Sequence, residues 1–228
     1  MTLGLVIGNK NYSSWSMRPW VLMRQLGIPF DERKLRLDFS EGSPFRTELA
    51  RVSPAGRVPV LVLDDGQAVW DTLAIIETLH EHFPDHGVWP ADRSARARAR
   101  SLCAEMHGGF DALRTHCPMN IEAVLPDAGA RVWAELPALR HDVARIESMW
   151  ADALQASGGP MLFGAFSAAD AFFAPVCLRL RGYALPVADT TAAYAQRVVQ
   201  TAGVAAWIAD ALTEHDFIVE DEPYRSHR

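Results

Sequence analysis

The sequence predicts an α/β domain followed by an all-helical domain. Short apolar runs rich in β-branched residues, typical of strands, occur before residue 84 of the 228-residue chain and alternate there with helical patterns. After the turn-rich connector 84–92, such runs become scarce and alanine, leucine and arginine dominate. We therefore predict a first domain at 1–83, a linker at 84–92 and a helical domain at 93–228.

The first domain is expected to open with a strand and a helix. The apolar run 3–8 suits a buried strand, and the loop 9–16 leads into a helical pattern of apolar residues that Gly27 ends. Residues 35–39, Leu-Arg-Leu-Asp-Phe, alternate between apolar and charged or polar positions and predict a second strand. A second helix follows it in the predicted order.

A hairpin is predicted where Pro59 heads an apolar run. The Asp65-Gly66 pair separates residues 60–63 from 68–70, and glycine supplies the positive φ of a tight turn, so the two strands should be antiparallel neighbours. Only X-Pro bonds adopt the cis form cheaply, at about 0.5–1 kcal/mol. A cis Val58–Pro59 bond would turn the backbone N–H and C=O of Val58 sideways, where an extended peptide ligand could pair with them.

Asp71 and Thr72 precede another helix. Apolar residues from Leu73 onward are spaced for one helix face, and Thr72 is the expected N-cap. The free N–H groups and positive dipole end of this helix, with a hydroxyl and a carboxylate beside them, could hold both charges of an α-amino acid. The order strand, helix, strand, helix, hairpin, helix (βαβαββα) is that of a thioredoxin-like domain.

The second domain is expected to be all-helical. Ser167, followed three residues later by Asp170, fits a capping box at the start of one helix. The polar tail 220–228 is either disordered or covers the site. The helices are expected at about 93–117, 131–156, 167–181, 190–201 and 204–213.

Composition argues against several classes of function. A net charge of −6 disfavours a nucleic-acid surface, and no apolar run approaches the roughly 20 residues of a membrane helix. The N-terminus has no signal-peptide pattern. The three cysteines form no Cys-x-x-Cys pair and are expected to be free thiols, and no cluster of residues suggests a metal site. We therefore expect a cytoplasmic protein without a nucleic-acid, membrane or metal partner.

Together these motifs resemble the glutathione transferase superfamily. Asp71-Thr72 stands where the family usually carries Glu/Gln-Ser, and the serine loop most resembles zeta-like and related bacterial classes, with Trp15 where a zeta-type loop has cysteine. The resemblance implies glutathione as co-substrate, a homodimer and a role in detoxification. The other segments that carry it are the serine loop 13–16, the stretch 53–59 before the hairpin, and 164–170, which looks like the capping box of the family's helical domain.

Two serines are candidates for activating the glutathione thiol. An unactivated thiol has a pKa of about 8.5, and a hydroxyl that donates a hydrogen bond to the sulfur raises the thiolate fraction. Ser16 is the expected N-cap of the first helix, because Pro19 then falls in the first turn, where its missing N–H has no intrahelical partner. Ser14 is then free to face the ligand sulfur, whereas Ser13 fits the zeta-type alignment better, so both remain candidates.

The resemblance also assigns the remaining glutathione contacts. The backbone of Val58, next to Pro59, would pair with the cysteinyl segment. Asp71 and Thr72 would hold the γ-glutamyl amine and carboxylate. Candidates for the glycyl carboxylate are Arg57, which adjoins Val58, and Lys10 and Lys34.

A pocket for the electrophile is expected between the first helix and the helical domain. The predicted reaction is conjugation of the glutathione thiolate to a soft electrophile that is small and either hydrophobic or acidic. The alternatives are a glutathione-dependent cis–trans isomerase of the maleylacetoacetate type and a non-catalytic glutathione-binding or regulatory module. Residues expected to line the pocket are Tyr12, Trp15, Met106, His107 and Phe110, with Arg179 or Arg181 offering positive charge to an acidic substrate.

Overall fold

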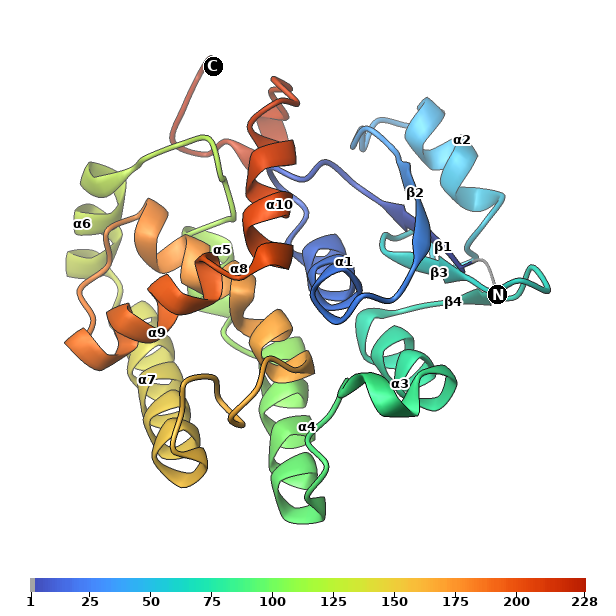
Figure 1. Ribbon diagram of the computed structural model, residues 1–228. Helices are drawn as coiled ribbons and strands as arrows, with labels where there is room; N and C mark the ends of the chain where they lie inside the picture. The colour runs from blue at the N-terminus through green and yellow to red at the C-terminus, as the bar shows by residue number, and fades with distance from the viewer. Residues whose placement is uncertain (1–2) are drawn as a thin grey trace.

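A four-stranded mixed sheet forms the centre of the N-terminal domain in the computed structural model, which describes residues 3–228 (Figure 1). The strand order is β2-β1-β3-β4; β1 and β2 are parallel, and the other two pairs are antiparallel. This is the predicted βαβαββα order. Its elements are β1 (Leu3–Ile7), α1 (Ser14–Leu26), β2 (Phe30–Lys34), α2 (Pro44–Ala50), β3 (Val60–Val62), β4 (Ala68–Val69) and α3 (Thr72–His82).

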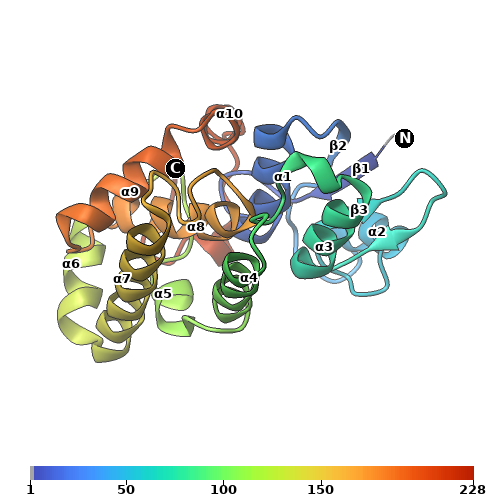
Figure 2. The ribbon, with the colours of Figure 1, turned by 60° about the horizontal axis from the view of Figure 1, so that its bottom comes forward.

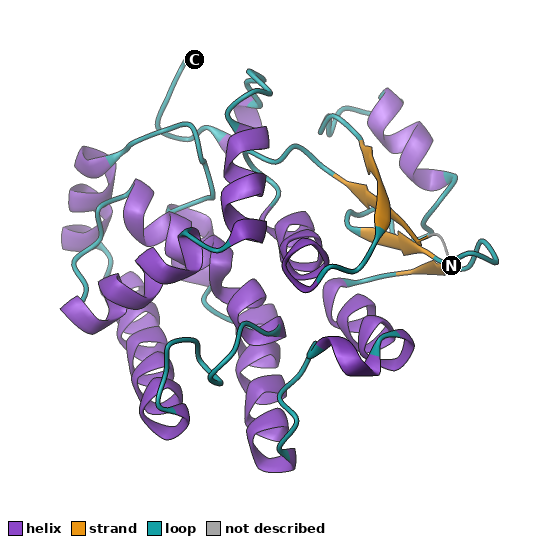
Figure 3. Cartoon of the chain, in the orientation of Figure 1, coloured by secondary structure: helices purple, strands orange, loops and turns teal. Residues whose placement is uncertain are grey.

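The central strand β1 sends its side chains to two different helical layers. Leu5 and Ile7 belong to the main core, which α1 and α3 share. Val6 points to the other face, where it packs with Phe45 and Leu49 of α2. Because side chains alternate along a strand, β1 joins the two layers, and the sheet lies between α2 on one side and α1 and α3 on the other (Figure 3).

The second strand lies five residues before its predicted position. β2 is Phe30–Lys34, and residues 35–39 have no regular secondary structure, so the prediction of a strand at 35–39 was wrong. β2 is an edge strand whose last four residues are charged and exposed, and such charges protect a free sheet edge from pairing with another chain. Because these residues do not alternate between apolar and polar, the sequence gives no strand signal here. The alternation at 35–39 instead reflects Leu37, which is buried beside α2.

β3 and β4 form the predicted hairpin. Gly66 in the turn has a φ of 85°, which glycine adopts without steric cost, and the Leu63 N–H donates to the carbonyl of Gln67 at 2.9 Å. The Val58–Pro59 bond just before β3 is cis. Within residues 3–228, neither backbone polar group of Val58 is hydrogen-bonded, so both are available to a ligand.

The chain from residue 93 onward is helical as predicted, but two predicted helices are each divided in two. The helix expected at 93–117 breaks at Gly109, after which Phe110 has a φ of 61°. The helix expected at 131–156 is interrupted at Pro137, a residue type that suits the first position of a helix. Within residues 3–228, no helix has the length and apolarity of a membrane span. The helices are α4 (Arg93–Gly108), α5 (Asp111–His116), α6 (Pro126–Glu135), α7 (Pro137–Ser157), α8 (Ala168–Gly182), α9 (Asp189–Val199) and α10 (Ala202–Ala211), with 3-10 turns η1 (Pro84–His86) and η2 (Val219–Asp221).

Helix α1 connects the two domains. It lies between the sheet on one side and α8 and α10 on the other (Figures 1 and 2). Gly203, near the start of α10, allows this close approach, because a Cβ at that position would meet the carbonyl oxygen of Val21 at 2.6 Å. Side chains at the start of α1 therefore face the helical domain directly.

The predicted capping box of α8 is confirmed. Asp170 is fully buried, and its Oδ2 accepts hydrogen bonds from the Ser167 N–H at 2.9 Å and the Ser167 hydroxyl at 3.3 Å. Its Oδ1 accepts from the Leu162 N–H at 3.1 Å and from the Tyr194 hydroxyl at 2.9 Å. Burial raises the pKa of Asp170, whereas the hydrogen bonds act in the opposite direction. One carboxylate thus joins α8, α9 and the loop before α8.

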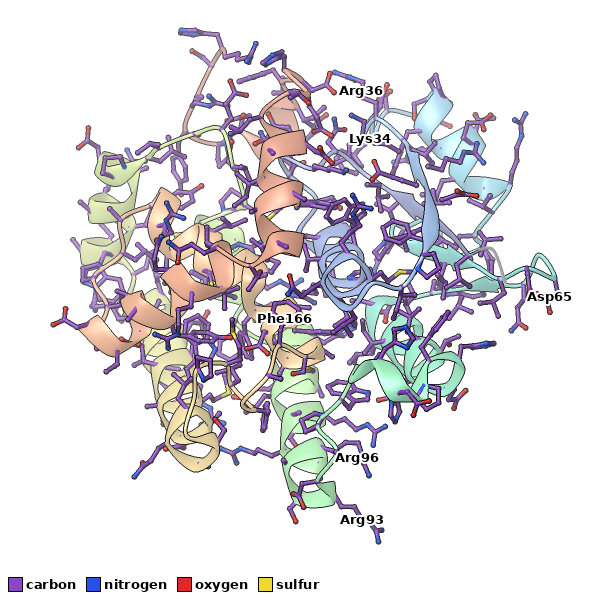
Figure 4. All side chains as sticks on the ribbon, in the orientation of Figure 1. Lys34, Arg36, Asp65, Arg93, Arg96 and Phe166 are labelled. Atoms are coloured by element: carbon purple, nitrogen blue, oxygen red, sulfur yellow. The ribbon has the colours of Figure 1, made fainter. Side chains whose placement is uncertain are left out.

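The segment 212–228 packs against the N-terminal domain instead of extending into solvent. Glu214 pairs with Lys34 at 2.9 Å and Asp216 pairs with Arg36 at 3.0 Å, at the edge where Figure 4 labels the two basic residues. The tail 220–228 was expected to be either disordered or a cover over the site; Glu222 in this tail accepts a hydrogen bond from Tyr12, so the structure shows the second alternative.

Candidate active site

Two adjoining cavities lie where α1 and β3 meet the helical domain. The larger cavity, of about 680 Å³, is lined by residues that include Tyr12, Ser13, Ser14 and Arg179. The smaller cavity, of about 580 Å³, is lined by residues that include Pro59, Asp71, Thr72 and His107. Both cavities share Trp15, Arg57, Val58 and Arg114.

Helix α1 begins earlier than predicted, and Ser13 is its N-cap in place of Ser16. The Ser13 Oγ accepts from the Ser16 N–H at 3.4 Å and donates to the Ser16 Oγ at 2.7 Å. Ser16 is instead tied to the end of β1, because its Oγ accepts from the Gly8 N–H at 3.1 Å. Pro19 consequently lies inside α1, where it leaves the Trp15 carbonyl without its usual helical donor.

Ser14 is the first residue of α1 and contacts the helical domain. Its Oγ accepts a hydrogen bond from Arg179 Nη2 at 3.3 Å, and Arg179 Nε donates to the Cys117 carbonyl at 2.9 Å. The Ser14 hydroxyl proton is therefore not committed to any residue in the described range, whereas that of Ser13 is committed to Ser16. The hydrogen bond from the cationic Arg179 to Ser14 Oγ also polarises the Ser14 O–H bond. Ser14 is therefore a stronger hydrogen-bond donor toward the larger cavity.

Three arginines gather near the start of α1: Arg179 contacts Ser14, Arg18 and Arg114 contact Trp15, and Arg114 also pairs at 3.8 Å with Asp111. The guanidinium carbons of Arg18 and Arg114 lie 4.3 Å and 4.8 Å from the Trp15 ring centroid. Among residues 3–228, neither Arg18 nor Arg179 forms an ion pair, although both are buried. Burial, followed by the charges of the neighbouring arginines, lowers the pKa of Arg18 to about 9 and that of Arg179 to about 10. Both remain protonated at neutral pH and make this region electropositive.

The smaller cavity presents a carboxylate and an unpartnered hydroxyl at the start of α3. Asp71, not Thr72, is the N-cap, because its Oδ1 accepts from the Leu73 N–H at 3.3 Å. Thr72 is thus the first helical residue, and its buried Oγ1 has no hydrogen-bond partner within the described chain. The second oxygen of Asp71 lies 3.1 Å from His107 Nε2, which belongs to α4.

Two of the three candidates for the glycyl carboxylate are engaged elsewhere. Lys10 is buried, with Nζ 2.8 Å from Glu32 and 2.6 Å from Asp210, and lies over the ring of Trp20. Lys34 pairs with Glu214. Both assignments were wrong, because these lysines join the two domains instead of facing the cavities. Arg57 is exposed and lines both cavities.

The predicted pocket residues divide between the cavities and the core. Tyr12, Trp15 and Arg179 line the larger cavity, whereas His107 lines the smaller one. Met106 and Phe110 are buried in the main core, so their assignment to the pocket was wrong. Arg181, the alternative to Arg179, is exposed on the outer side of α8.

The C-terminal segment closes part of the larger cavity. The Tyr12 hydroxyl donates to Glu222 at 2.6 Å and to the Asp216 carbonyl at 3.1 Å; burial and the bond to Glu222 raise the pKa of Tyr12 to about 12. Tyr12 therefore stays protonated and fixes the segment in place. Asp221 lines the same cavity, and burial together with Glu220 and Glu222 raises its pKa to about 6.

Comparison with known proteins assigns the family of the N-terminal domain. Residues 12–82 match the family model for the glutathione S-transferase N-terminal domain. Residues 12–82 therefore form a glutathione S-transferase N-terminal domain. A probable maleylacetoacetate isomerase of Caenorhabditis elegans is 32% identical over 101 residues, so the match spans 44% of this chain and less than half, 45%, of that protein. Glutathione S-transferase 1 of Dianthus caryophyllus is 27% identical over 78% of each chain.

Solved structures of glutathione transferases share the whole fold. A homolog from Burkholderia GL BGR1, with bound glutathione, has a TM-score of 0.67 at 23% identity and covers 93% of this chain and 98% of its own. A glutathione transferase from Methylococcus capsulatus str. Bath has a TM-score of 0.66 at 23% identity, covering 92% and 99%. These likenesses confirm the predicted fold class, a thioredoxin-like domain followed by a helical domain.

Two arginines beside the candidate site were not predicted: Arg114 lines both cavities, and Arg18 is buried against Trp15. Arg18 lies in a helix segment that also carries Met17 and Trp20 and is buried almost throughout. A charged residue in such an apolar segment was the available signal for a special role. Arg114 gave no comparable signal, because α5 was expected to be part of a longer helix.

Proposed function

We propose that this protein conjugates glutathione to soft electrophiles that carry a negative charge, with Ser14 activating the thiol. The observation that carries the proposal is the hydrogen bond from the cationic Arg179 to Ser14 Oγ, which leaves the serine proton free at the mouth of an electropositive cavity. A sulfur bound at that mouth could accept this proton in a hydrogen bond.

The smaller cavity and its rim suit the γ-glutamyl end of glutathione. Thr72 offers a hydroxyl without a partner among the described residues, beside the positive end of α3, and suits a carboxylate. Asp71 suits the neighbouring ammonium group. The free N–H and C=O of Val58 suit the cysteinyl backbone, and the exposed Arg57 suits the glycyl carboxylate.

Ser14 is proposed to lower the pKa of the thiol by donating a hydrogen bond to the sulfur. Bound glutathione supplies the nucleophile, and the protein's task is to favour its ionised form. Arg179 strengthens the serine donor, the N-terminus of α1 adds a positive partial charge, and Arg18 and Arg114 add full charges nearby. Hydrogen bonding and positive charge both stabilise a thiolate, so no protein base is required.

The larger cavity suits an anionic electrophile. Aromatic side chains such as Tyr12 and Phe45 give it an apolar wall, and Arg114 and Arg179 supply positive charge. Negative charge develops on an electrophile when a thiolate adds to it, and preorganised cations stabilise such charge in a partly desolvated site. The same groups would also bind a carboxylate that the electrophile already carries.

A second candidate function is glutathione-dependent cis–trans isomerisation. It is supported by the isomerase names of several relatives and by the same positive charge, which would stabilise the adduct formed when the thiolate adds to an activated double bond. The two reactions differ in stoichiometry. Conjugation consumes one glutathione per electrophile, whereas isomerisation returns it.

Substitution of Ser14 by alanine is expected to raise the pKa of the bound thiol by about one to two units, equivalent to about 1.4–2.7 kcal/mol of lost thiolate stabilisation. The measurement is an ultraviolet titration of thiolate absorbance with wild-type protein and Ser14→Ala and Ser13→Ala variants. Ser13→Ala serves as the matched control, because the Ser13 hydroxyl caps α1 and is expected to affect stability more than the thiol.

The outcomes separate the functions considered. A depressed thiol pKa that rises only in Ser14→Ala supports thiol activation by Ser14. An unshifted pKa in all three proteins, with glutathione bound, would mean that Ser14 activates no thiol and would favour a binding module. A larger effect in Ser13→Ala would assign the activating hydroxyl to Ser13.

A further inference from the structure

We infer that His107 is a positioning residue for glutathione, which holds the Asp71 carboxylate toward the ligand ammonium group and makes binding weaken as the pH falls below neutral. The inference rests on the proposed function, in which Asp71 receives the γ-glutamyl amine. It assigns to His107 a role at the glutathione end of the site, away from the electrophile pocket where the sequence predicted it.

Three contacts place His107 beside the smaller cavity. Its Nε2 lies 3.1 Å from Asp71 Oδ2, and its ring meets Trp15 edge to face, with centroids 5.0 Å apart. Its backbone carbonyl accepts a long hydrogen bond from Arg114 at 3.4 Å. The Asp71 side chain is itself 57% exposed, so without His107 only its N-cap bond to Leu73 would restrict it. His107 therefore fixes the second carboxylate oxygen from the opposite domain.

The surroundings of His107 favour its neutral form. With Nε2 facing a carboxylate oxygen, the ring proton belongs on Nε2, which leaves Nδ1 as an acceptor. Nδ1 is buried without a partner in the described structure, so a second proton there would gain no hydrogen bond. The charged groups that face the ring are Asp71, the N-cap of α3, Arg18 of α1 and Arg114 of α5. Burial and the two arginines lower the pKa of His107, and they outweigh Asp71, which raises it.

A protonated His107 and the ligand ammonium would compete for one carboxylate. When His107 is neutral, Asp71 keeps its full charge for the ammonium group. When His107 gains a proton, the imidazolium pairs with Asp71 and also repels the incoming cation. By linkage, the bound ammonium lowers the pKa of His107 further, so glutathione affinity is highest above the pKa of His107 and falls as the pH drops through it.

The test is the affinity for S-methylglutathione, measured calorimetrically between pH 5.0 and 7.0. This probe has no ionisable thiol, and in that range its carboxylates stay ionised and its amine protonated. We expect wild-type affinity to fall about 5- to 10-fold from pH 7.0 to 5.0. His107→Gln, whose amide can donate to Asp71 but does not titrate, should keep wild-type affinity at pH 7.0 and lose the fall.

Two further variants separate positioning from general effects. His107→Phe keeps a ring against Trp15 without the donor, and should weaken binding about 3- to 10-fold at pH 7.0. His141→Gln, an exposed histidine on α7, is the matched control and should reproduce the wild-type pH profile. Asp221 also titrates near this range, but its protonation removes a negative charge and would strengthen binding of this anionic probe at low pH, the opposite direction.

Each outcome bears on the inference. The role of His107 would be overturned if the affinity of His107→Gln still fell with pH, or if wild-type protein bound the probe equally well from pH 7.0 to 5.0. Either result would leave the proposed function standing. Unchanged affinity in His107→Phe at pH 7.0 would overturn the positioning of Asp71. Absence of binding by wild-type protein at every pH would overturn both proposals.

Discussion

Replacement of Asp170 by alanine is expected to lower the free energy of unfolding by about 3–5 kcal/mol. The carboxylate accepts hydrogen bonds from Ser167, Leu162 and Tyr194 in a fully buried site. Alanine would leave these donors buried and unsatisfied, at about 1–3 kcal/mol each before relaxation. The large effect arises because one side chain both caps α8 and joins it to α9 and the preceding loop.

Urea unfolding followed by circular dichroism measures this effect. Tyr194→Phe removes one of the donors to Asp170 and adds no buried polar atom. It is expected to lower the free energy of unfolding by only about 1 kcal/mol. Asp152→Ala is the matched control, because this aspartate is exposed on α7 and its loss should change stability by less than about 0.5 kcal/mol. A loss below about 1 kcal/mol for Asp170→Ala would contradict a strongly stabilising role for the buried carboxylate.

The sequence predicts best those features that depend on local chemistry. The hairpin follows from Asp65-Gly66 and the capping box from Ser167 and Asp170, because turn and cap geometry is fixed within a few residues. β2 was misplaced because an edge strand is defined by its pairing with β1, and its exposed charges give no periodic signal.

The site was predictable in part for the same reason. Asp71 and Thr72 were found because they begin a helix, although which of them is the cap depends on the final backbone. The choice between Met106 and His107 depends on how α4 is rotated against α1, and one residue of difference decides between core and cavity. The cluster of arginines requires α1, α5 and α8 to converge, which no spacing along the chain encodes.

Replacement of Arg179 by methionine is expected to lower kcat/KM about 100-fold more for an anionic electrophile than for a neutral one of similar size and reactivity. Arg179 has two proposed roles. The first acts with any electrophile: Arg179 supports the thiolate through Ser14 and stabilises the negative charge that develops during addition. The second is attraction to a carboxylate that the electrophile already carries, which acts on anionic electrophiles alone. The ratio of the two kcat/KM values cancels the first role and reports the second. A buried charge–anion contact contributes about 1.5–3 kcal/mol, which corresponds to a factor of about 10 to 150.

The variant is expected to fold, because Arg179 forms no ion pair among the described residues and its Nη1 has no hydrogen-bond partner there. Methionine fills a similar volume without a buried charge, and the lost hydrogen bond to the Cys117 carbonyl is expected to cost about 1–3 kcal/mol. Arg181→Met provides the matched control, since Arg181 lies on the same helix but is exposed, and it should leave both kcat/KM values unchanged. An equal loss for the two electrophiles in Arg179→Met would restrict Arg179 to its action through Ser14. The larger cavity would then select electrophiles by shape and apolar contact, and the positive charge gathered around Trp15 would serve the thiolate alone.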